Sequence, residues 1–591
     1  MNNLYTSHLK RLLCFIASVA ITLVLGSCAS LPRVTDSEKA VAGRSPNSTT
    51  AIIRYDSIHH PTISSRGMVV SQNAIASQVG RDILAKGGNA IDAAVATGFA
   101  LAVTLPRAGN IGGSGFMLVY LAEQQEIIAL DYRSQAPALM TEDVYTKSNG
   151  DIDWERFKFG PLAPAVPGTV AGMHEAWKRY GSLPWPELIA PAIKLAQNGI
   201  TVSDDLAYVL GQASNVMKRY ASTADIFLKP NGELFEAGDL LVQTDLAWSL
   251  AQIRDGGAAA FYRGELGRRL VKGLRADGGV MSLQDLDDYQ VHKREPVKGQ
   301  YRGHTVFAAP PVSGGGVTLI QMLKVLGHFD LAGFPQGSAK SIHIIAETMK
   351  RSAANRRVGL GDPDYVDVPV NGFISDALAA DLAAQINQNV VTPVKAIEPA
   401  DAGRYESRET THYSVVDRHG NAAANTYTLG YSFGSGYVAP GTGILMDNQV
   451  RNFTYGKPGH ANAIAPGKRM LSTMTPTIVL DEDNELMLVT GTPGGGRIIN
   501  VILQVLVNVI DYELNIAEAT HAPRIHQQWR TPSLGVEKGT GVDTIRLLES
   551  LGHEVKVQPA MGSVQSIMVR DGFMYGSADP RRPGARAVGL E

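Results

Sequence analysis

Two strand-like segments around residue 410 are the feature that most constrains how this chain folds. Polar and apolar side chains alternate within residues 409–417 and 422–429, and both segments contain β-branched side chains. The polar turn between them, with the sequence Asp-Arg-His-Gly-Asn, is typical of a β-hairpin. The chain is therefore expected to pair these segments as antiparallel neighbours.

Thr410 stands at the start of this hairpin, and its hydroxyl becomes reactive only if the peptide bond before it is cut. A freed Thr410 would carry an α-amino group with a pKa of about 7.7–8, so that part of the amine is neutral and can take the proton of the neighbouring hydroxyl. In an uncut chain Thr410 is an ordinary strand residue. The polar, helix-poor stretch over 393–408 predicts an exposed loop suited to such a cut.

Strand-like and helix-like segments are grouped along the chain rather than strictly alternating. This grouping predicts an α+β fold with antiparallel sheets. Helices are expected over 74–86, 90–105, 173–180 and 498–509 and in a segment ending near 326, and strands over 116–121, 301–309, 475–480, 486–490 and 567–570 and in a segment ending at 133.

The composition is that of an ordinary soluble globular protein of 591 residues. Charged residues make up 19% of the chain and the net charge is −2. Without a basic excess or a long run of one charge, the composition argues against a nucleic-acid partner.

The first residues have the pattern of an export signal. Lys10 and Arg11 precede an uncharged apolar run over 12–25, which is too short to span a bilayer comfortably and is typical of a signal peptide. The run ends in Leu-Gly-Ser-Cys, which is similar to the bacterial lipobox and would make Cys28 the lipidated first residue. An ordinary cleavage site after small residues is the alternative.

The cysteines and the polar stretch after the leader complete the predicted organisation. Cys14 and Cys28 are the only cysteines and both lie in the leader, so no disulfide is expected in the mature protein. A signal segment over 1–28 and a flexible tether over 29–66 are expected to precede the folded body. The predicted location is the bacterial periplasm or cell envelope, with a lipid anchor if Cys28 is modified.

Several motifs in the body of the chain closely resemble those of the γ-glutamyltransferases, also called glutathione hydrolases. The resemblance begins near Met68 and continues to the C-terminal region, with the segments in the same order. The stretches that carry it are 131–133, 310–311, 410–417, 426–428, 471–477 and 491–495.

The resemblance implies a fold and a processing step. The fold would be the four-layer αββα sandwich of the N-terminal nucleophile hydrolases, with two stacked, mainly antiparallel sheets. The precursor would cut itself between Glu409 and Thr410, giving a large subunit (67–409) and a small subunit (410–591) that stay together. Thr410 would then accept a γ-glutamyl group from glutathione or a related compound and pass it to water, an amino acid or a peptide, without a cofactor or a metal.

The resemblance also assigns a role to each matched position. Thr428 would orient Thr410, and the backbone N–H groups of Gly494 and Gly495 would form the oxyanion hole, where glycine allows close approach of the reacting carbonyl. The substrate would be held by Arg133, Ser472 and Thr473 at its α-carboxylate and by Gln449 and Asn452 near its α-amino group.

Three positions depart from the family pattern. Asn452 stands where the family has an aspartate that pairs with the substrate ammonium, and Gly430 stands where the family has Asn or Glu. The segment over 453–468 is shorter than the lid of some relatives, which predicts a more open site. A glutaryl or cephalosporin-type acylase, or a relative that processes poly-γ-glutamate, therefore remains the alternative function.

Other interpretations of the sequence are weaker. Ser432 lies in a Gly-x-Ser-x-Gly pattern, but no helix is expected directly after it, as a serine elbow requires. The glycine-rich stretch over 109–115 leads into a strand rather than a helix, so close backbone packing is expected there instead of a phosphate site. His521 and His526 lack metal-ligand spacing. An unprocessed, anchored binding protein is the remaining non-enzymatic interpretation.

Overall fold

The computed structural model describes residues 57–356, 359–397 and 409–591. The predicted signal segment, Cys28, most of the tether and residues 398–408 of the predicted cleavage loop lie outside these described residues. Strand β10 (Glu409–Asp417) begins at the residue before Thr410.

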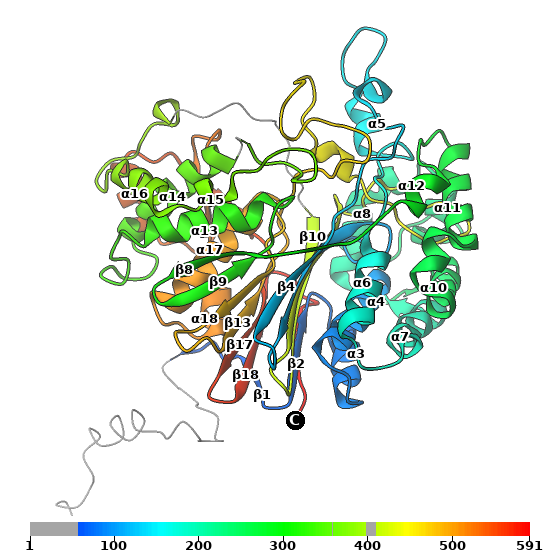
Figure 1. The fold of residues 1–591 in the computed structure, drawn as a ribbon, viewed down its shortest axis with the longest axis horizontal. Coiled ribbons are helices and arrows are strands. Elements are labelled where there is room, and N and C mark those ends of the chain that lie inside the picture. The colour runs from blue at the N-terminus through cyan, green and yellow to red at the C-terminus, as the bar shows by residue number, and fades with distance from the viewer. Residues whose placement is uncertain (1–56, 357–358, 398–408) are drawn as a thin grey trace, which may run out of the picture. The chain divides into compact units, whose positions relative to one another are not determined.

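Two seven-stranded antiparallel sheets form the centre of the folded unit (Figure 1). The first has the order β1 (Thr62–Ser64), β18 (Phe573–Ala578), β17 (Gln565–Arg570), β13 (Leu486–Thr490), β12 (Thr477–Leu480), β9 (His304–Ala308) and β8 (Val297–Tyr301). The second has the order β19 (Arg586–Gly589), β2 (Gly67–Ser71), β10, β11 (Ala422–Gly430), β3 (Ser114–Leu121), β4 (Glu126–Tyr132) and β7 (His292–Arg294).

The two sheets pack face to face through an apolar layer. Alternate residues of the strands point into it, as the two-residue period of a strand requires. In β2 these are Met68 and Val70, which share a buried cluster with Val489 and Ile567 of the opposite sheet. The candidate site lies beyond this apolar layer, at one end of the strands.

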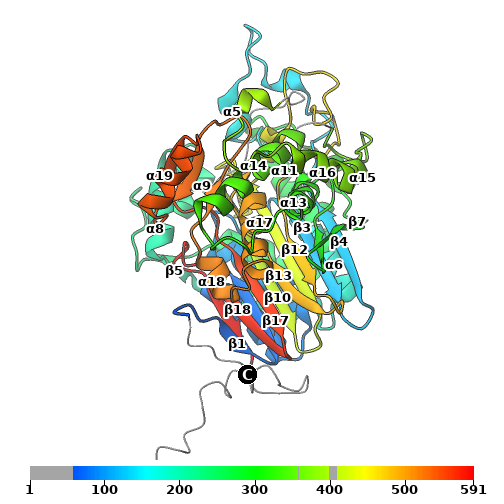
Figure 2. The ribbon, with the colours of Figure 1, turned by 90° about the vertical axis from the view of Figure 1, so that its left-hand side faces the viewer.

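Helices cover the outer face of each sheet, so that the described unit has four layers in the order helix, sheet, sheet, helix (Figures 1 and 2). This confirms the αββα sandwich. The layer against the sheet of β10 consists of α3 (Ala74–Ala85), α4 (Ala90–Thr104), α6 (Thr169–Tyr180), α7 (Trp185–Asn198), α10 (Thr244–Tyr262) and α11 (Glu265–Ala276). The layer against the sheet of β13 consists of α13 (Gly314–Leu326), α14 (Ala339–Arg356), α17 (Arg497–Ile510) and α18 (Ile516–His521).

Further helices and two small sheets surround these layers. The remaining helices are α5 (Trp154–Lys158), α8 (Asp204–Met217), α9 (Ala221–Phe227), α12 (Leu283–Asp287), α15 (Val370–Phe373), α16 (Asp376–Ala384) and α19 (Val542–Ser550), with 3₁₀ turns η2 (Glu142–Tyr145), η3 (Val394–Ala396) and η4 (Gln449–Asn452). Two small sheets contain β14 (Ile525–His526), β15 (Leu534–Glu537) and β16 (Val555–Gln558), and β5 (Ile200–Thr201) and β6 (Leu240–Leu241).

Most predicted elements agree with the structure to within a few residues, and two differences have clear causes. The strand expected over 301–309 is two strands, because Arg302 and Gly303 both have positive φ angles and form the tight turn between β8 and β9. The tether expected over 29–66 contains β1, whose residues pair with β18. Short edge strands of this kind carry little sequence pattern of their own.

Candidate functional site

Thr410 lies at the edge of the hairpin where the regular pairing of β10 with β11 is interrupted. Glu409 pairs with Gly430 and Thr411 with Tyr427, so Thr410 faces two residues of β11, Thr428 and Leu429, and a β-bulge falls in β11 opposite Thr410. Bulges redirect side chains at the ends of strands. The Thr410 hydroxyl donates to Thr428 Oγ1 at 3.2 Å, and Thr428 Oγ1 also accepts from the backbone N–H of Gly430 at 2.9 Å. Both predicted threonines are therefore brought together, as expected.

Gln449 fixes the strand that carries Thr428. Its Nε2 donates to the carbonyl of Thr428 at 2.9 Å and lies 2.9 Å from Ser114 Oγ, and its side chain is fully buried. Gly113, in the glycine-rich stretch before Ser114, packs so closely that a Cβ there would lie 2.2 Å from the Thr428 carbonyl oxygen. Close backbone packing is thus what this stretch provides, as predicted.

Arg133 follows the end of β4 and is 1% exposed. Its Nε donates to the carbonyl of Met470 at 3.1 Å, and its Nη1 lies 3.4 Å from Ser114 Oγ. Its Nη2 is buried without a hydrogen-bond partner among the described residues. Buried charged donors are ordinarily paired, so this free edge of the guanidinium is suited to an incoming anion.

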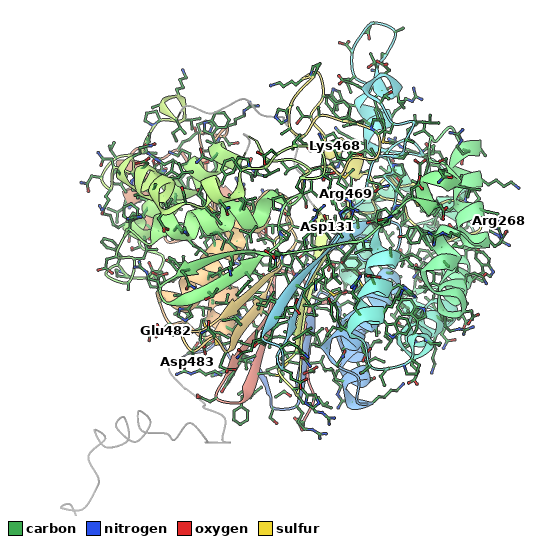
Figure 3. All side chains as sticks on the ribbon, in the orientation of Figure 1. Asp131, Arg268, Lys468, Arg469, Glu482 and Asp483 are labelled. Carbon is green, nitrogen blue, oxygen red and sulfur yellow. The ribbon has the colours of Figure 1, made fainter. Side chains whose placement is uncertain are left out.

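A buried ion network behind Arg133 fixes the backbone at the end of β4. Asp131 Oδ1 accepts from the backbone N–H of Arg133 at 2.9 Å, and Asp131 Oδ2 pairs with Arg294 at 2.9 Å and Arg469 at 3.2 Å. Figure 3 labels Asp131 and Arg469, which lie close together near the centre of the molecule. The sequence motif pointed to Asp131 but not to its two arginine partners, which come from distant segments.

The two loops predicted to hold the carboxylate and the oxyanion contact each other. Thr473 Oγ1 donates to the carbonyl of Gly495 at 3.0 Å, and Ser472 Oγ accepts from the backbone N–H of Met474 at 3.1 Å. Gly494 and Gly495 have φ angles of 137° and 58° and precede α17. Among the described residues neither of their N–H groups has a hydrogen-bond acceptor. Two such donors in sequence can bind a developing oxyanion.

His412 connects β10 to the glycine loop, a role that the sequence did not reveal. Its ring bonds to Thr426 Oγ1 at 2.8 Å and Ser414 Oγ at 3.0 Å, and it lies where a Cβ on Gly491 would be 2.3 Å away. Burial lowers the pKa of His412 to about 3. The imidazole is therefore neutral at physiological pH and serves as a packing and hydrogen-bonding group.

Asp447 is a buried carboxyl next to the site. Its Oδ1 accepts from the backbone N–H of Ala165 at 2.8 Å and its Oδ2 from Gln449 Nε2 at 2.9 Å. Burial raises the pKa of Asp447 to about 7, although the Ala165 N–H and the positive charge of Arg133 favour the ionised form. Near neutral pH this carboxyl is thus divided between its charged and neutral forms.

Replacing Asp447 should change how stability depends on pH. Because its folded pKa lies above the ordinary value of about 3.9, the folded state keeps a proton between about pH 4 and 7 that the unfolded state has lost. The stability that this proton contributes is present below about pH 4 and is lost as the pH rises through 7. Asp447→Asn cannot ionise, so its free energy of unfolding relative to the wild type should rise by about 1–3 kcal/mol from pH 5 to pH 8.

Denaturant unfolding at the two pH values measures this effect. Asp483→Asn, at an exposed carboxyl between β12 and β13, is the matched control for exchanging an aspartate for an asparagine. A pH-dependent change for Asp447→Asn no larger than that of the control would contradict the prediction.

Asn448 explains the glycine at position 430. Gly430 has a φ angle of 100°, and a Cβ there would lie 2.2 Å from Asn448 Oδ1. Asn448 Oδ1 accepts from the backbone N–H of Tyr431 at 3.0 Å, and Asn448 Nδ2 donates to the carbonyls of Lys158 and Gly434 at 2.9 Å. The space that a side chain at 430 would need is therefore occupied by a fixed amide.

Gly430→Ala should lower the free energy of unfolding more than an alanine at a glycine that also has a positive φ angle but has free space around the added Cβ. Gly441 has a φ angle of 70°, and a Cβ there would meet no other atom within 4 Å, so Gly441→Ala isolates the backbone cost. We expect Gly430→Ala to lower the free energy of unfolding by about 2 kcal/mol more than Gly441→Ala. Urea unfolding of both variants in an uncleavable Thr410→Ala background provides the measurement, and equal losses would refute the steric explanation.

Asn452 ends the 3₁₀ turn η4 that begins with Gln449. Residues three apart are eclipsed on such a turn, so Asn452 and Gln449 share a face. Asn452 Oδ1 is buried without a hydrogen-bond partner among the described residues, while its backbone carbonyl accepts from Asn462 at 2.7 Å. Asn452 thus offers an unused neutral acceptor, in keeping with its predicted position near a substrate amine.

The rival interpretations find no support in the described residues. Ser432 lies in a succession of turns after β11, and residues 431–448 contain no helix, so the serine elbow is absent. No group of three or more His, Cys, Asp or Glu side chains in the described part of the chain could hold a metal ion. Nor is any described helix long and apolar enough to cross a membrane.

The described site residues all lie within the part of the chain that matches a known family. A family model described as gamma-glutamyltranspeptidase matches residues 76–589. The chain belongs to the gamma-glutamyltranspeptidase family.

Similar proteins include some named glutathione hydrolase and others named acylase. A glutathione hydrolase proenzyme of Escherichia coli (strain K12) is 44% identical over 580 residues, covering 96% of this chain and 98% of that protein. An acylase ACY 1 proenzyme of Pseudomonas sp. (strain V22) is 36% identical over 532 residues, covering 89% and 94%. The crystal structure of a cephalosporin acylase from Bacillus halodurans is 29% identical with a TM-score of 0.82, covering 92% and 99%. Because these names differ in the acyl group that the enzyme accepts, membership of the family does not identify the acyl group for this chain, and the residues of the site have to be considered.

Proposed function

We propose that this chain is a self-cleaving γ-glutamyl hydrolase and transferase that acts on glutathione and related γ-glutamyl compounds. The observation that carries the proposal is the hydrogen bond between Thr410 and Thr428 at the bulge where β10 begins. This hydrogen bond orients the hydroxyl of Thr410, which becomes an N-terminal residue if the peptide bond after Glu409 is cut. The names of the glutathione hydrolase relatives support the substrate class.

The first reaction is cleavage of the chain's own backbone. Thr410 Oγ attacks the carbonyl carbon of Glu409, the bond to the Thr410 nitrogen breaks, and the nitrogen takes up a proton. The ester that forms between Glu409 and Thr410 is hydrolysed by water, which leaves a carboxylate on Glu409 and returns the hydroxyl to Thr410. The free α-amino group then provides a base beside the nucleophile.

The second reaction transfers the acyl group. Thr410 Oγ attacks the γ-carbonyl of the substrate, its proton passes through the α-amino group to the departing amine, and a γ-glutamyl ester forms on Thr410. Water or an acceptor amine then attacks the ester. The N–H groups of Gly494 and Gly495, unpaired among the described residues, stabilise the oxyanion of both steps, a contribution of about 3–4 kcal/mol for each good donor.

The substrate's amino-acid end is held by groups that have unused hydrogen-bonding capacity among the described residues. The free Nη2 of Arg133 receives the α-carboxylate, together with the hydroxyl of Ser472 on the adjoining loop. The Thr473 hydroxyl donates to the Gly495 carbonyl in the structure, so it joins them only when its proton turns from that carbonyl to the substrate. The free Oδ1 of Asn452 accepts from the α-ammonium. A neutral amide loses about 1–2 kcal/mol of charge assistance relative to a carboxylate.

N-terminal sequencing of purified protein, combined with a γ-glutamyl anilide assay, tests the proposal. We expect two fragments, the smaller beginning at Thr410, and release of the aniline by the processed form. A single uncut chain that binds γ-glutamyl compounds without hydrolysing them would instead support the anchored binding protein.

A glutaryl or cephalosporin-type acylase is the second candidate, favoured by Asn452 and by the acylase relatives. Glutaryl amides lack the α-amino group, so they lose nothing where the family's aspartate is missing. Comparing kcat/KM for γ-glutamyl and glutaryl anilides decides between the two, and a clear advantage for the glutaryl compound would replace the proposed substrate.

Export with lipidation at Cys28 is part of the same proposal, supported by the apolar run and the Leu-Gly-Ser-Cys sequence of the leader. We expect Cys28→Ala to shift the protein from the membrane fraction to the soluble fraction. Fractionation and mass spectrometry of the mature N-terminus measure this, and an unlipidated wild-type protein would refute the anchor while leaving the enzymatic proposal intact.

A further inference from the structure

Arg451, in the 3₁₀ turn η4, is a buried cation that the proposed mechanism does not use. Its side chain is 2% exposed, and among the described residues its Nη1 and Nη2 have no hydrogen-bond partners. Its Nε lies 3.4 Å from Asn448 Oδ1. Buried guanidinium groups are ordinarily paired along the edge that carries the Nη atoms. The edge suited to a planar anion therefore has no partner within the described part of the chain.

The ring of Tyr431 holds this guanidinium in place. Arg451 Cζ lies 3.8 Å from the ring centroid, and Tyr431 itself is partly exposed. A stacked ring covers the face of a guanidinium but leaves its in-plane N–H groups free for bidentate binding of a carboxylate. Tyr431 thus orients Arg451 and favours its charged form, while Nη1 and Nη2 keep no hydrogen-bond partner among the described residues.

Arg451 is linked by short contacts to the proposed nucleophile. Tyr431 directly follows Gly430, whose N–H donates to Thr428 Oγ1, which accepts in turn from Thr410. Gly430 also packs on Asn448, whose Oδ1 faces Arg451 Nε. The free edge therefore belongs to the same end of the sheet as the reacting hydroxyl.

The local charge balance favours a further anion. Burial lowers the pKa of both Arg133 and Arg451 to about 10, so both remain charged at neutral pH. The positive charge of Arg451 also acts to lower the pKa of Arg133. Asp447 opposes the shift at both residues, and Tyr431 opposes it more strongly than Asp447 at Arg451. Asp447 already accepts hydrogen bonds from Ala165 and Gln449. This internal carboxyl is thus shared between two cations.

We propose that Arg451 binds a carboxylate on the amine side of the scissile amide, that is, on the leaving peptide or the acceptor amino acid or peptide. The inference rests on the proposed function, in which Arg133 binds the α-carboxylate of the γ-glutamyl group, the only carboxylate on that side of the scissile amide. The free N–H groups of a second guanidinium therefore need a carboxylate on the other side. The leaving amine and the incoming amine occupy the same place because transfer is the reverse of acylation, so one residue serves both. The preferred partners are therefore peptides and amino acids with a free C-terminus.

Two pairs of compounds that differ only in this charge provide the test. The donors are γ-glutamyl 3-carboxy-4-nitroanilide and its 3-carbamoyl analogue, and the acceptors are glycylglycine and glycylglycinamide. In the wild type we expect the acidic member of each pair to have the higher kcat/KM. Arg451→Met should reduce the donor ratio at least about tenfold, mainly through KM, and Arg451→Lys should restore part of it.

Arg219→Met is the matched control. Arg219 lies over the ring of Phe159 at 5.0 Å, and that ring is 6.5 Å from the ring of Tyr431, but Arg219 is exposed and paired with Glu155. Its removal takes one positive charge from the same neighbourhood without touching the site, so both ratios should be unchanged.

Several results would overturn the inference. Equal losses for acidic and neutral compounds in Arg451→Met would show that Arg451 is structural. If Arg451→Met instead lowers the ratio of kcat/KM for the γ-glutamyl anilide to kcat/KM for the 4-aminobutyryl anilide, Arg451 binds the α-carboxylate of the γ-glutamyl group. If neither Arg451 variant folds, equal wild-type rates for the acidic and neutral members of both pairs would refute it. Failure of the wild type to hydrolyse any γ-glutamyl anilide would instead refute the proposed function.

Discussion

Thr410→Ala should yield a single uncut chain without measurable γ-glutamyl transfer. The substitution removes the hydroxyl that attacks Glu409 and, with it, both the later nucleophile and the α-amino base. Loss of a nucleophile typically lowers kcat by several orders of magnitude, and we expect a reduction of at least about 10³-fold. Gel electrophoresis under denaturing conditions and the γ-glutamyl anilide assay report the two effects.

Thr410→Ser is the matched control because it keeps a hydroxyl on the same backbone. It should be cut after Glu409, more slowly than the wild type, and should retain measurable turnover. Removing the methyl group loosens the rotamer of a side chain that is only 3% exposed and donates to Thr428 at 3.2 Å. Full turnover by an uncut Thr410→Ala chain would be incompatible with a nucleophile at this position.

Arg133→Met should have the second largest effect, through binding of the donor. The guanidinium is buried and its Nη2 is unpartnered among the described residues, so the substrate carboxylate completes its hydrogen bonding. Truncating one member of a buried, charged pair leaves the other member unpaired and typically costs about 2–5 kcal/mol. We expect kcat/KM for a γ-glutamyl anilide to fall by about 10²–10³-fold, mostly through a higher KM.

The 4-aminobutyryl anilide separates this role from a structural one, because it lacks the α-carboxylate. Its kcat/KM should be low with the wild type and should change little in Arg133→Met. Arg133→Lys should recover part of the activity towards the γ-glutamyl compound, since a single ammonium cannot reproduce the two-pronged contact. Equal losses for both compounds would mean that Arg133 only supports the fold around Ser114 and Met470.

The sequence predicted the parts of the site that depend on local pattern. The alternating hairpin placed Thr410 and Thr428 on paired strands, and the apolar helix after the glycine loop agrees with α17 to within a residue. These elements are recognisable because their side chains follow one period over many residues. The positions of Arg133, Gln449 and the glycine pair came from a family resemblance, and the structure gathers them at one end of the two sheets.

The remaining features depend on contacts between distant segments. Asp447 has a raised pKa only because Ala165 and the surrounding core bury it, and Asn448 excludes a side chain at Gly430 only after the chain has folded. The sequence shows only that Arg451 precedes Asn452. In the folded chain Arg451 stacks on Tyr431, and its Nη1 and Nη2 have no hydrogen-bond partner among the described residues. Short irregular turns such as η4 have no periodic signal, so their side-chain directions are set by tertiary packing.

The order of strands also determines how the two fragments would hold together after the proposed cut between Glu409 and Thr410. In one sheet β10 and β11, downstream of the cut, lie between β2 and β3, which are upstream of it; in the other, β18 through β12 lie between β1 and β9. Strands of the two fragments are therefore hydrogen-bonded to each other in both sheets. The fragments can dissociate only if these strand pairs are broken, so dissociation and global unfolding should be a single event.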